Sequence, residues 1–152
     1  NESRCARGQA WGLYGFTMMY RFTKDKAYLR QAQGIADMII SHLPKDGIPY
    51  WDFNAPDIPK ALRDASAGAI IASALIELSE YSPEKRETYL SIAERQLRTL
   101  SSKKYLAPVG TNGNFILRHS VGHLPGNSEV DVALTYADYY FIEALLRWKK
   151  LK

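Results

Sequence analysis

The stretch from Arg63 to Tyr81 reads RDASAGAIIASALIELSEY, and it decides the fold because a helix of this sequence is apolar around most of its circumference. A typical surface helix shows only one apolar stripe, whereas a helix that is apolar all round is buried. The residues that widen the stripe are small or aliphatic: Ala69, Ile70, Ala72, Ala74, Leu75 and Leu78. The sequence therefore predicts an inner helix with neighbours on several sides.

Four further segments carry helical patterns, at about 6–22, 25–43, 82–102 and 130–151. The first and last are rich in small and aromatic residues, as the inner helix is. The other two have one apolar face each, which is typical of an outer layer. Stop signals at Pro44 and Gly47 end the second segment, and Ser82 as N-cap with Pro83 starts the fourth. Inner and outer helices are therefore expected to alternate.

The connections between these helices are of two lengths. Turns from an inner to an outer helix are tight, whereas the connections from an outer to the next inner helix are long, at about 44–62 and 103–128. Hairpins of this kind are typical of helical repeats. The pattern predicts an all-α fold of α/α hairpin repeats that close into a toroid. Both long loops should lie at one rim, beside the N-terminal ends of the inner helices, where we expect the functional site.

Composition narrows the class of protein. With 152 residues, 46% of them hydrophobic, the chain suits a single domain, 1–152. The net charge of +4 is mild, and its single cysteine excludes an internal disulfide. No apolar run reaches the roughly 18 residues of a membrane span, and no signal peptide is visible. Since the chain begins without methionine, we expect a processed chain or a fragment, and its localisation stays open. The basic tail is interpreted as a helix C-terminus rather than a nucleic-acid surface; it comprises Arg147, Lys149, Lys150 and Lys152.

The first helix has an unusual start, RGQAWGLYGF, which begins at Arg7. Its glycines, Gly8, Gly12 and Gly15, share one face of the helix, which we call the glycine face. Each glycine costs about 1 kcal/mol relative to alanine inside a helix. They predict close approach of a neighbouring helix or of a ligand. The arginine opposes the helix dipole, which favours acids in the first turn. An arginine near Trp11 suits an anion attached to a ring, because the guanidinium binds a carboxylate and the indole covers a sugar face.

The long loops carry weaker signals. Asp64 is interpreted as the N-cap of the inner helix rather than as a catalytic acid. Trp51 beside Asp52 fits either a loop anchor or a contact to carbohydrate. His119 and His123 are four residues apart, but a glycine and a proline nearby argue against a helix, so no metal is expected. No nucleotide-binding loop or nucleophile elbow is present, and no cofactor is expected.

Four stretches together resemble the unsaturated glucuronyl hydrolases, glycoside hydrolase family 88. They match in order and spacing, and they are ARGQAWGLYGF (6–16), DGIPYWDF (46–53), RDASAGAI (63–70) and ADYYFIEALLR (137–147). The resemblance spans essentially the whole chain. It implies an (α/α)6 toroid of six hairpins, of which this chain is about half, on the C-terminal side.

The resemblance also implies an activity. The family hydrates the 4,5 double bond of an unsaturated uronic acid at the non-reducing end of oligosaccharides left by polysaccharide lyases. The resulting hemiketal collapses and releases the neighbouring sugar. An aspartic acid acts as general acid and base, but the family's two key aspartates are expected upstream of Asn1. We therefore predict no catalytic residue in this chain and no turnover by it alone.

Substrate binding is what the resemblance carries over to these residues. Arg7 and Trp11 match the family's contacts to the uronate and to the sugar ring, and Gln9 is a weaker candidate. The expected partner is an unsaturated uronic-acid oligosaccharide, with neither nucleic acid nor membrane. The family often has tryptophan in place of Cys5 and serine in place of Ala65, which affects subsite details.

Two alternatives stay open. One is an unsaturated rhamnogalacturonyl hydrolase, which has the same fold and chemistry. The other is a non-catalytic helical module that binds sugars or proteins. In addition, half of a toroid would expose the apolar faces of its first and last inner helices, so we expect such a chain to form homo-oligomers or to aggregate.

Overall fold

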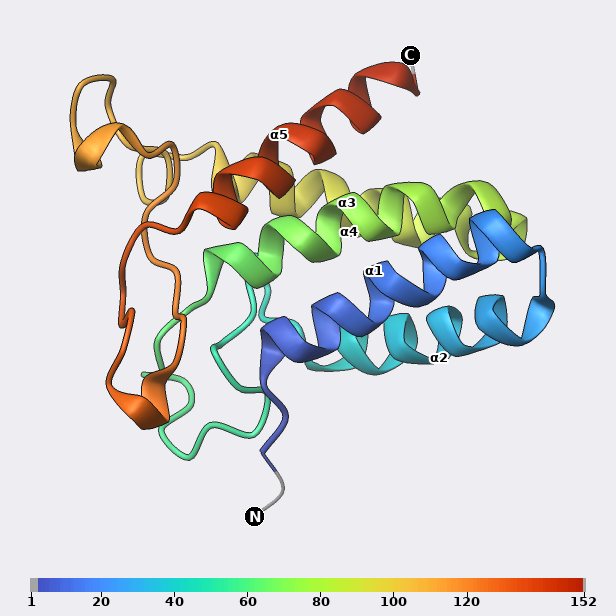
Figure 1. Cartoon of the computed structure of the whole chain (residues 1–152), viewed down its shortest axis with the longest axis horizontal. Helices are drawn as coiled ribbons and strands as arrows, with labels where there is room; N and C mark the ends of the chain where they lie inside the picture. The colour runs from blue at the N-terminus through green and yellow to red at the C-terminus, as the bar shows by residue number, and fades with distance from the viewer. Residues whose placement is uncertain (1–2, 152) are drawn as a thin grey trace.

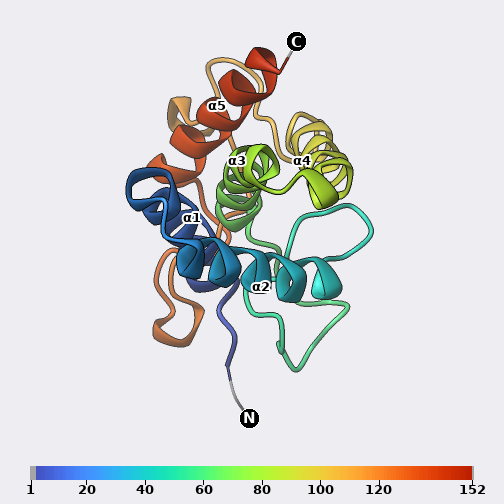
Figure 2. The ribbon, with the colours of Figure 1, turned by 90° about the vertical axis from the view of Figure 1, so that its right-hand side faces the viewer.

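A computed structural model of the chain describes residues 3–151, which form five α-helices in two layers (Figure 1). The inner layer holds α3 (Ala65–Tyr81) between α1 (Ala6–Thr23) and α5 (Thr135–Lys150). The outer layer holds α2 (Lys26–His42), which packs on α1, and α4 (Arg86–Leu100), which packs on α3 (Figure 2). Three short 3₁₀ turns complete the secondary structure of this part of the chain: η1 (Pro83–Lys85), η2 (Asn112–Asn114) and η3 (Leu124–Gly126).

Helix α3 is the centre of the core, as its sequence predicts. Every residue from Ala65 to Ser79 is buried. Three helices, α1, α4 and α5, pack against it, and the small residues around its circumference let each of them approach closely. The alternation of inner and outer helices is confirmed by these contacts.

The turn between α1 and α2 is tight because Lys24 adopts a left-handed conformation, with φ of 59°. Its N–H donates to the carbonyl of Tyr20 at 2.8 Å and closes α1. Asp25 then starts α2 by accepting a hydrogen bond from the backbone N–H of Ala27 at 2.8 Å. The two helices therefore reverse direction within two residues, Lys24 and Asp25.

The predicted start of the fourth helix needs a correction. Ser82 does not cap it with its side chain, and a 3₁₀ turn, η1, precedes α4. The Ser82 hydroxyl instead accepts a hydrogen bond from the Gln33 side chain at 2.9 Å. The serine is buried and ties α2 to the turn between α3 and α4.

The fifth helix begins at Thr135 and not near 130, because the residues before it are used in a hairpin. Ser120 and Val132 exchange two backbone hydrogen bonds of 2.8 Å. Asp131 has a φ of 55°, which a helix cannot accommodate. We call residues 119–132 the rim hairpin. Of the basic tail, Lys149 and Lys150 lie in the last turn of α5, whereas Lys152 lies outside the described residues.

A polar network joins the three inner helices. On α5, Glu143 accepts hydrogen bonds from Tyr14 of α1 at 2.8 Å and from Ser73 of α3 at 2.6 Å. Arg147 donates to the backbone carbonyl of Ser73 at 2.9 Å and lies 3.5 Å from the buried carboxylate of Glu77. The last basic residues were expected to serve only the helix dipole, but Arg147 turns inward into this network.

The two edges of the inner layer are apolar and open. On α5, Tyr139, Ile142 and Leu146 are 59%, 44% and 55% exposed, and their spacing places them on one stripe. On α1, the glycine face borders a shallow apolar groove of about 320 Å³ that is lined by Trp11, Gly12, Gly15, Phe16, Met18 and Met19. None of the helices among residues 3–151 is both long and apolar enough to cross a bilayer.

The expected close packing on the glycine face is found at Gly12 but not at Gly15. A Cβ atom built on Gly12 would meet the Ile35 side chain of α2 at 3.4 Å, whereas one on Gly15 would meet no atom of a neighbouring element within 4 Å. Nothing in residues 3–151 therefore requires glycine at position 15.

Candidate functional site

The N-terminal ends of α1, α3 and α5 lie at the same end of the molecule, together with the two long connections (Figure 1). We call this end the rim. The backbone N–H of Ala65 in α3 donates to the carbonyl of His119 at 3.0 Å, and the N–H of Ala6 in α1 donates to the carbonyl of Trp51 at 2.9 Å. The loops are therefore fixed to the helix starts by backbone hydrogen bonds.

Arg7 anchors the rim hairpin. Its two terminal nitrogens donate to the backbone carbonyls of Val121 and Gly122, and Nη1 lies 3.5 Å from Oδ2 of Asp64. The guanidinium also lies over the ring of Tyr136, 5.5 Å from its centroid. These partners explain how a cation is tolerated in the first turn of a helix, because a buried carboxylate and two carbonyl dipoles offset the unfavourable dipole.

Asp64 is the N-cap of α3, as predicted. Its Oδ1 accepts hydrogen bonds from the backbone N–H of Ser66 at 3.0 Å and from the Ser66 hydroxyl at 2.6 Å. The N–H of Val121 donates to the same oxygen at 3.3 Å. Burial raises the pKa of the Asp64 carboxyl above its ordinary value, while the Ser66 hydrogen bond and the Arg7 charge lower it in part. The Asp64 carboxylate is thus buried, and its hydrogen bond with Val121 links the start of α3 to the rim hairpin.

Trp11 lies one helical turn after Arg7 and belongs to the same surface. Its indole is 6.3 Å from the ring of Tyr136 and 5.1 Å from that of Tyr140, both on α5. The side chain of Trp11 is 37% exposed, and that of Arg7 is 17% exposed. The structure therefore brings Arg7 and Trp11 together around Tyr136 at the rim.

Gln9 is half-buried on the first turn of α1. Its side chain has no hydrogen-bond partner within residues 3–151. Its role in the site stays a prediction.

The 43–64 connection is held by its own charged residues. Arg63 donates to the Asp46 carboxylate at 2.8 Å and to the carbonyl of Ile48 at 2.6 Å, and its guanidinium lies 4.4 Å from the centroid of the Tyr50 ring. Asp52 is buried and accepts hydrogen bonds from Ser3 at 2.5 Å and from the N–H of Asn54 at 2.7 Å. These side chains are used within the loop, so the reading of Asp52 as a carbohydrate contact is not supported.

Trp51 lines a small hollow beside the anchor of the rim hairpin. The hollow measures about 210 Å³, and its other lining residues are Ser3, Cys5, Val121, Gly122, His123, Leu124 and Pro125. Cys5 is a free, exposed thiol. The hollow is next to Arg7, because Val121 and Gly122 are the residues that accept its hydrogen bonds.

One of the two loop histidines is paired within the rim hairpin. Nδ1 of His119 is 2.8 Å from the carboxylate of Asp131, and this pair closes the base of the rim hairpin. Across residues 3–151, no group of three or more His, Cys, Asp or Glu side chains is arranged to hold a metal ion.

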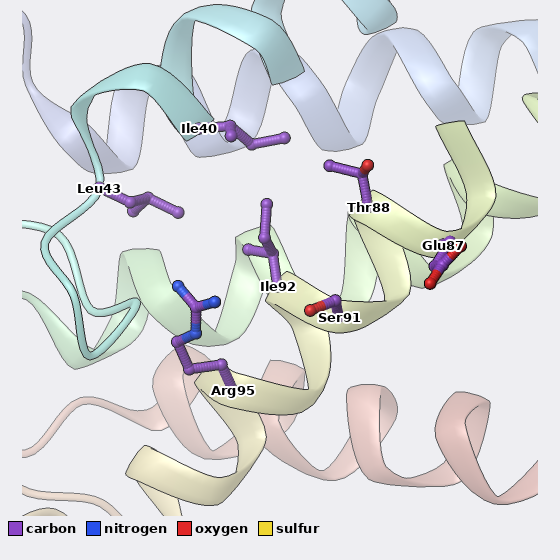
Figure 3. Close-up of a pocket in the computed structure, with 7 residues that line it drawn as sticks. All are labelled: Ile40, Leu43, Glu87, Thr88, Ser91, Ile92 and Arg95. Carbon is purple, nitrogen blue, oxygen red and sulfur yellow. The ribbon is translucent and has the colours of Figure 1, made fainter. Parts of the chain in front are cut away.

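A second hollow, of about 390 Å³, lies between the two outer helices (Figure 3). Ile40 of α2 and Leu43, which directly follows this helix, face Thr88 and Ile92 of α4, with Arg95 at one end of the group. None of the rim residues lines it. We place the functional site at the rim because Arg7, Trp11 and Tyr136 meet there.

The sequence did not single out Tyr136. It stands in the aromatic-rich stretch TYADYYF at 135–141, which reads as the start of a buried helix. The signal that could have found it is the density of tyrosines at the N-terminal end of an inner helix, since this end faces the rim.

No protein-family model matches the chain. The chain is 52% identical to an unsaturated glucuronyl hydrolase from Formosa agariphila over 152 aligned positions, which cover 99% of this chain and 38% of that protein. It is 36% identical to an unsaturated chondroitin disaccharide hydrolase from Streptococcus pyogenes over 154 aligned residues, 99% of this chain and 38% of that protein. The resemblance drawn from sequence is confirmed, because the relatives that align over nearly the whole chain include unsaturated glucuronyl hydrolases.

Solved structures agree. A crystal structure of an unsaturated glucuronyl hydrolase specific for heparin matches with a TM-score of 0.96 and 52% identity, over 99% of this chain and 41% of the other. A mutant of the Streptococcus agalactiae enzyme, complexed with dGlcA-GalNAc6S, matches with a TM-score of 0.90 and 34% identity, over 99% of this chain and 41% of the other. The all-α toroid fold is thereby confirmed. The chain spans about two fifths of the length of the curated relatives it matches, somewhat less than the predicted half.

Proposed function

We propose that this chain is part of a glycoside hydrolase that acts on oligosaccharides ending in a 4,5-unsaturated uronic acid. The reaction adds water across the double bond, and the hemiketal formed at C5 opens and releases the neighbouring sugar. The proposal is supported by the names of the relatives and by the substrate in the S. agalactiae complex. The observation that carries it here is the convergence of Arg7 and Trp11 on Tyr136 at the rim.

In this proposal the described rim supplies binding groups. Arg7 gives positive charge for the uronate carboxylate, and the exposed part of the Trp11 indole gives a face for the sugar ring. Gln9 is a further candidate for a sugar hydroxyl. Asp64 and Asp52 are both buried and hydrogen-bonded within the fold, so neither is assigned as the general acid. Together with the resemblance to the family, this leads us to propose that the general acid comes from a segment outside residues 1–152.

The test compares two proteins. One is the 152-residue chain, and the other is the longest protein that its gene encodes. Each is incubated with unsaturated disaccharides from heparin and from chondroitin, and the ultraviolet absorbance of the conjugated alkene is followed. We expect loss of absorbance with the longer protein and none with the chain alone.

Two outcomes would contradict the proposal. Turnover by the chain alone would place the acid within residues 1–152. Lack of turnover by the longer protein, with binding of the disaccharide retained, would favour the non-catalytic sugar-binding module.

A further inference from the structure

Both terminal nitrogens of Arg7 already have partners in the protein. Nη1 and Nη2 each donate to a carbonyl of the rim hairpin, and Nη1 also faces Asp64. A carboxylate that approaches both tips of the guanidinium fork would compete with these partners. A second donor beside Arg7 would let a carboxylate bind without displacing them.

The Tyr136 hydroxyl is such a donor. The centroid of the Tyr136 ring lies 5.5 Å from the Arg7 guanidinium and 6.3 Å from the centroid of the Trp11 indole. The side chain is partly exposed, and its hydroxyl has no hydrogen-bond partner within residues 3–151. Burial raises the pKa of this hydroxyl, so it stays protonated at neutral pH and is able to donate.

Other tyrosines at the inner layer use their hydroxyls differently. Tyr14 donates to Glu143 at 2.8 Å, and Tyr81 donates to Glu77 at 2.9 Å. Both belong to contacts that hold the inner helices together. Tyr136 combines a free hydroxyl with an adjacent cation and an adjacent partly exposed indole.

We infer that Tyr136 is a substrate-contacting residue, whose hydroxyl donates a hydrogen bond to the carboxylate of the uronic acid while the sugar ring lies on Trp11. This inference rests on the proposed function. The Arg7 charge has a supporting part, because it offsets part of the repulsion that the Asp64 and Glu129 carboxylates near Tyr136 exert on a bound carboxylate.

The test uses Tyr136→Phe in the longest protein that the gene encodes, with KM and kcat measured on an unsaturated disaccharide. Phenylalanine keeps the ring against Arg7 and Trp11, so we expect the melting temperature to stay unchanged. Loss of a hydrogen bond to a charged group should raise KM by roughly tenfold or more, with kcat little changed. Tyr139→Phe is the matched control, since that tyrosine is exposed on the same helix, and it should leave KM unchanged.

A second substrate tests the group that is contacted. The methyl ester of the unsaturated uronic acid offers only a neutral, weaker acceptor, so Tyr136→Phe should raise its KM by clearly less than it raises the KM of the free acid. An unchanged KM for the free acid, or the same increase for acid and ester, would overturn the inference while the proposed function stands. If the wild type itself shows no turnover, the proposed function fails, and the inference fails with it.

Discussion

Asp64 performs two tasks with one carboxylate at the start of α3. Oδ1 caps the helix through Ser66, and Oδ2 faces the Arg7 guanidinium. The cap needs an acceptor atom but no charge. The two tasks can therefore be separated by substitution.

We expect Asp64→Ala to lower the free energy of unfolding by about 1–2 kcal/mol, because the cap is lost. Asp64→Asn should cost less, since asparagine is also a good cap and Arg7 keeps its two carbonyl acceptors. Urea unfolding of the three proteins at neutral pH measures both effects. Equal losses in the two variants would show that the charge, and not the cap, is what matters.

The contribution of Asp64 to the stability of the fold should depend on pH in a defined direction. The pKa of Asp64 is raised from 3.8 in the folded state, mainly by burial. Its contribution to stability is therefore fully present below 3.8 and is lost as the pH rises through the folded pKa. The stability of the wild type relative to Asp64→Asn should fall over this window, and a difference that rises with pH would contradict the assigned cause.

The site was only partly predictable from sequence. Arg7 stood out because a cation is misplaced in the first turn of a helix, and its interactions at the rim explain that choice. Tyr136 could not be found in this way, because it meets Arg7 only after more than a hundred residues of chain have folded. A tyrosine among core aromatics gives no local signal of a free hydroxyl.

At the scale of elements, helix α1 has a glycine at position 15 that no contact among residues 3–151 requires. The groove beside Gly12 and Gly15 is apolar and open in residues 3–151. The glycines keep this side of α1 flat. A flat apolar side is what a further helix or a ligand would need in order to approach closely.

We expect Gly15→Ala to raise the free energy of unfolding of the chain by about 1 kcal/mol, because alanine is the better helix former and meets no atom. Gly34→Ala in α2 is the matched control, since a Cβ there also meets nothing within 4 Å. In the longest protein that the gene encodes, Gly34→Ala should still raise the free energy of unfolding. Gly15→Ala should no longer raise it if another element covers the groove. Destabilisation of the isolated chain by Gly15→Ala would contradict the open face.

Helix types were easier to predict than helix starts. The buried character of α3 follows from its composition, which no surface helix could have. The start of α5 was placed too early because the residues from 130 onward look helical by pattern, whereas Val132 pairs with Ser120 across the rim hairpin. Pairing between distant segments overrides local preference, and no window of sequence contains both partners.

At the scale of the whole molecule, the inner layer ends in two apolar edges. The stripe of Tyr139, Ile142 and Leu146 on α5 is exposed along the helix, and the groove on α1 is exposed at the other edge. Apolar surface gathered in this way tends to become an interface.

We therefore predict that the 152-residue chain self-associates through α5. Ile142→Lys combined with Leu146→Lys should reduce the mass measured by light scattering, because a charge on the stripe has to be desolvated on contact. Val109→Lys is the control, as this valine is fully exposed on a loop away from the helices. A monomeric wild type at the same concentration would count against the prediction.

The unequal connections have a consequence for how such a molecule can diverge. Between α1 and α2 the chain reverses through Lys24 and Asp25 alone, so any inserted residue there would shift one layer against the other. At the opposite end, long loops already connect α2 to α3 and α4 to α5. Doubling the length of such a loop costs only about 0.6 kcal/mol of additional closure entropy. New specificities are therefore cheapest to evolve at one end of the molecule, while the other end keeps the hairpins in register.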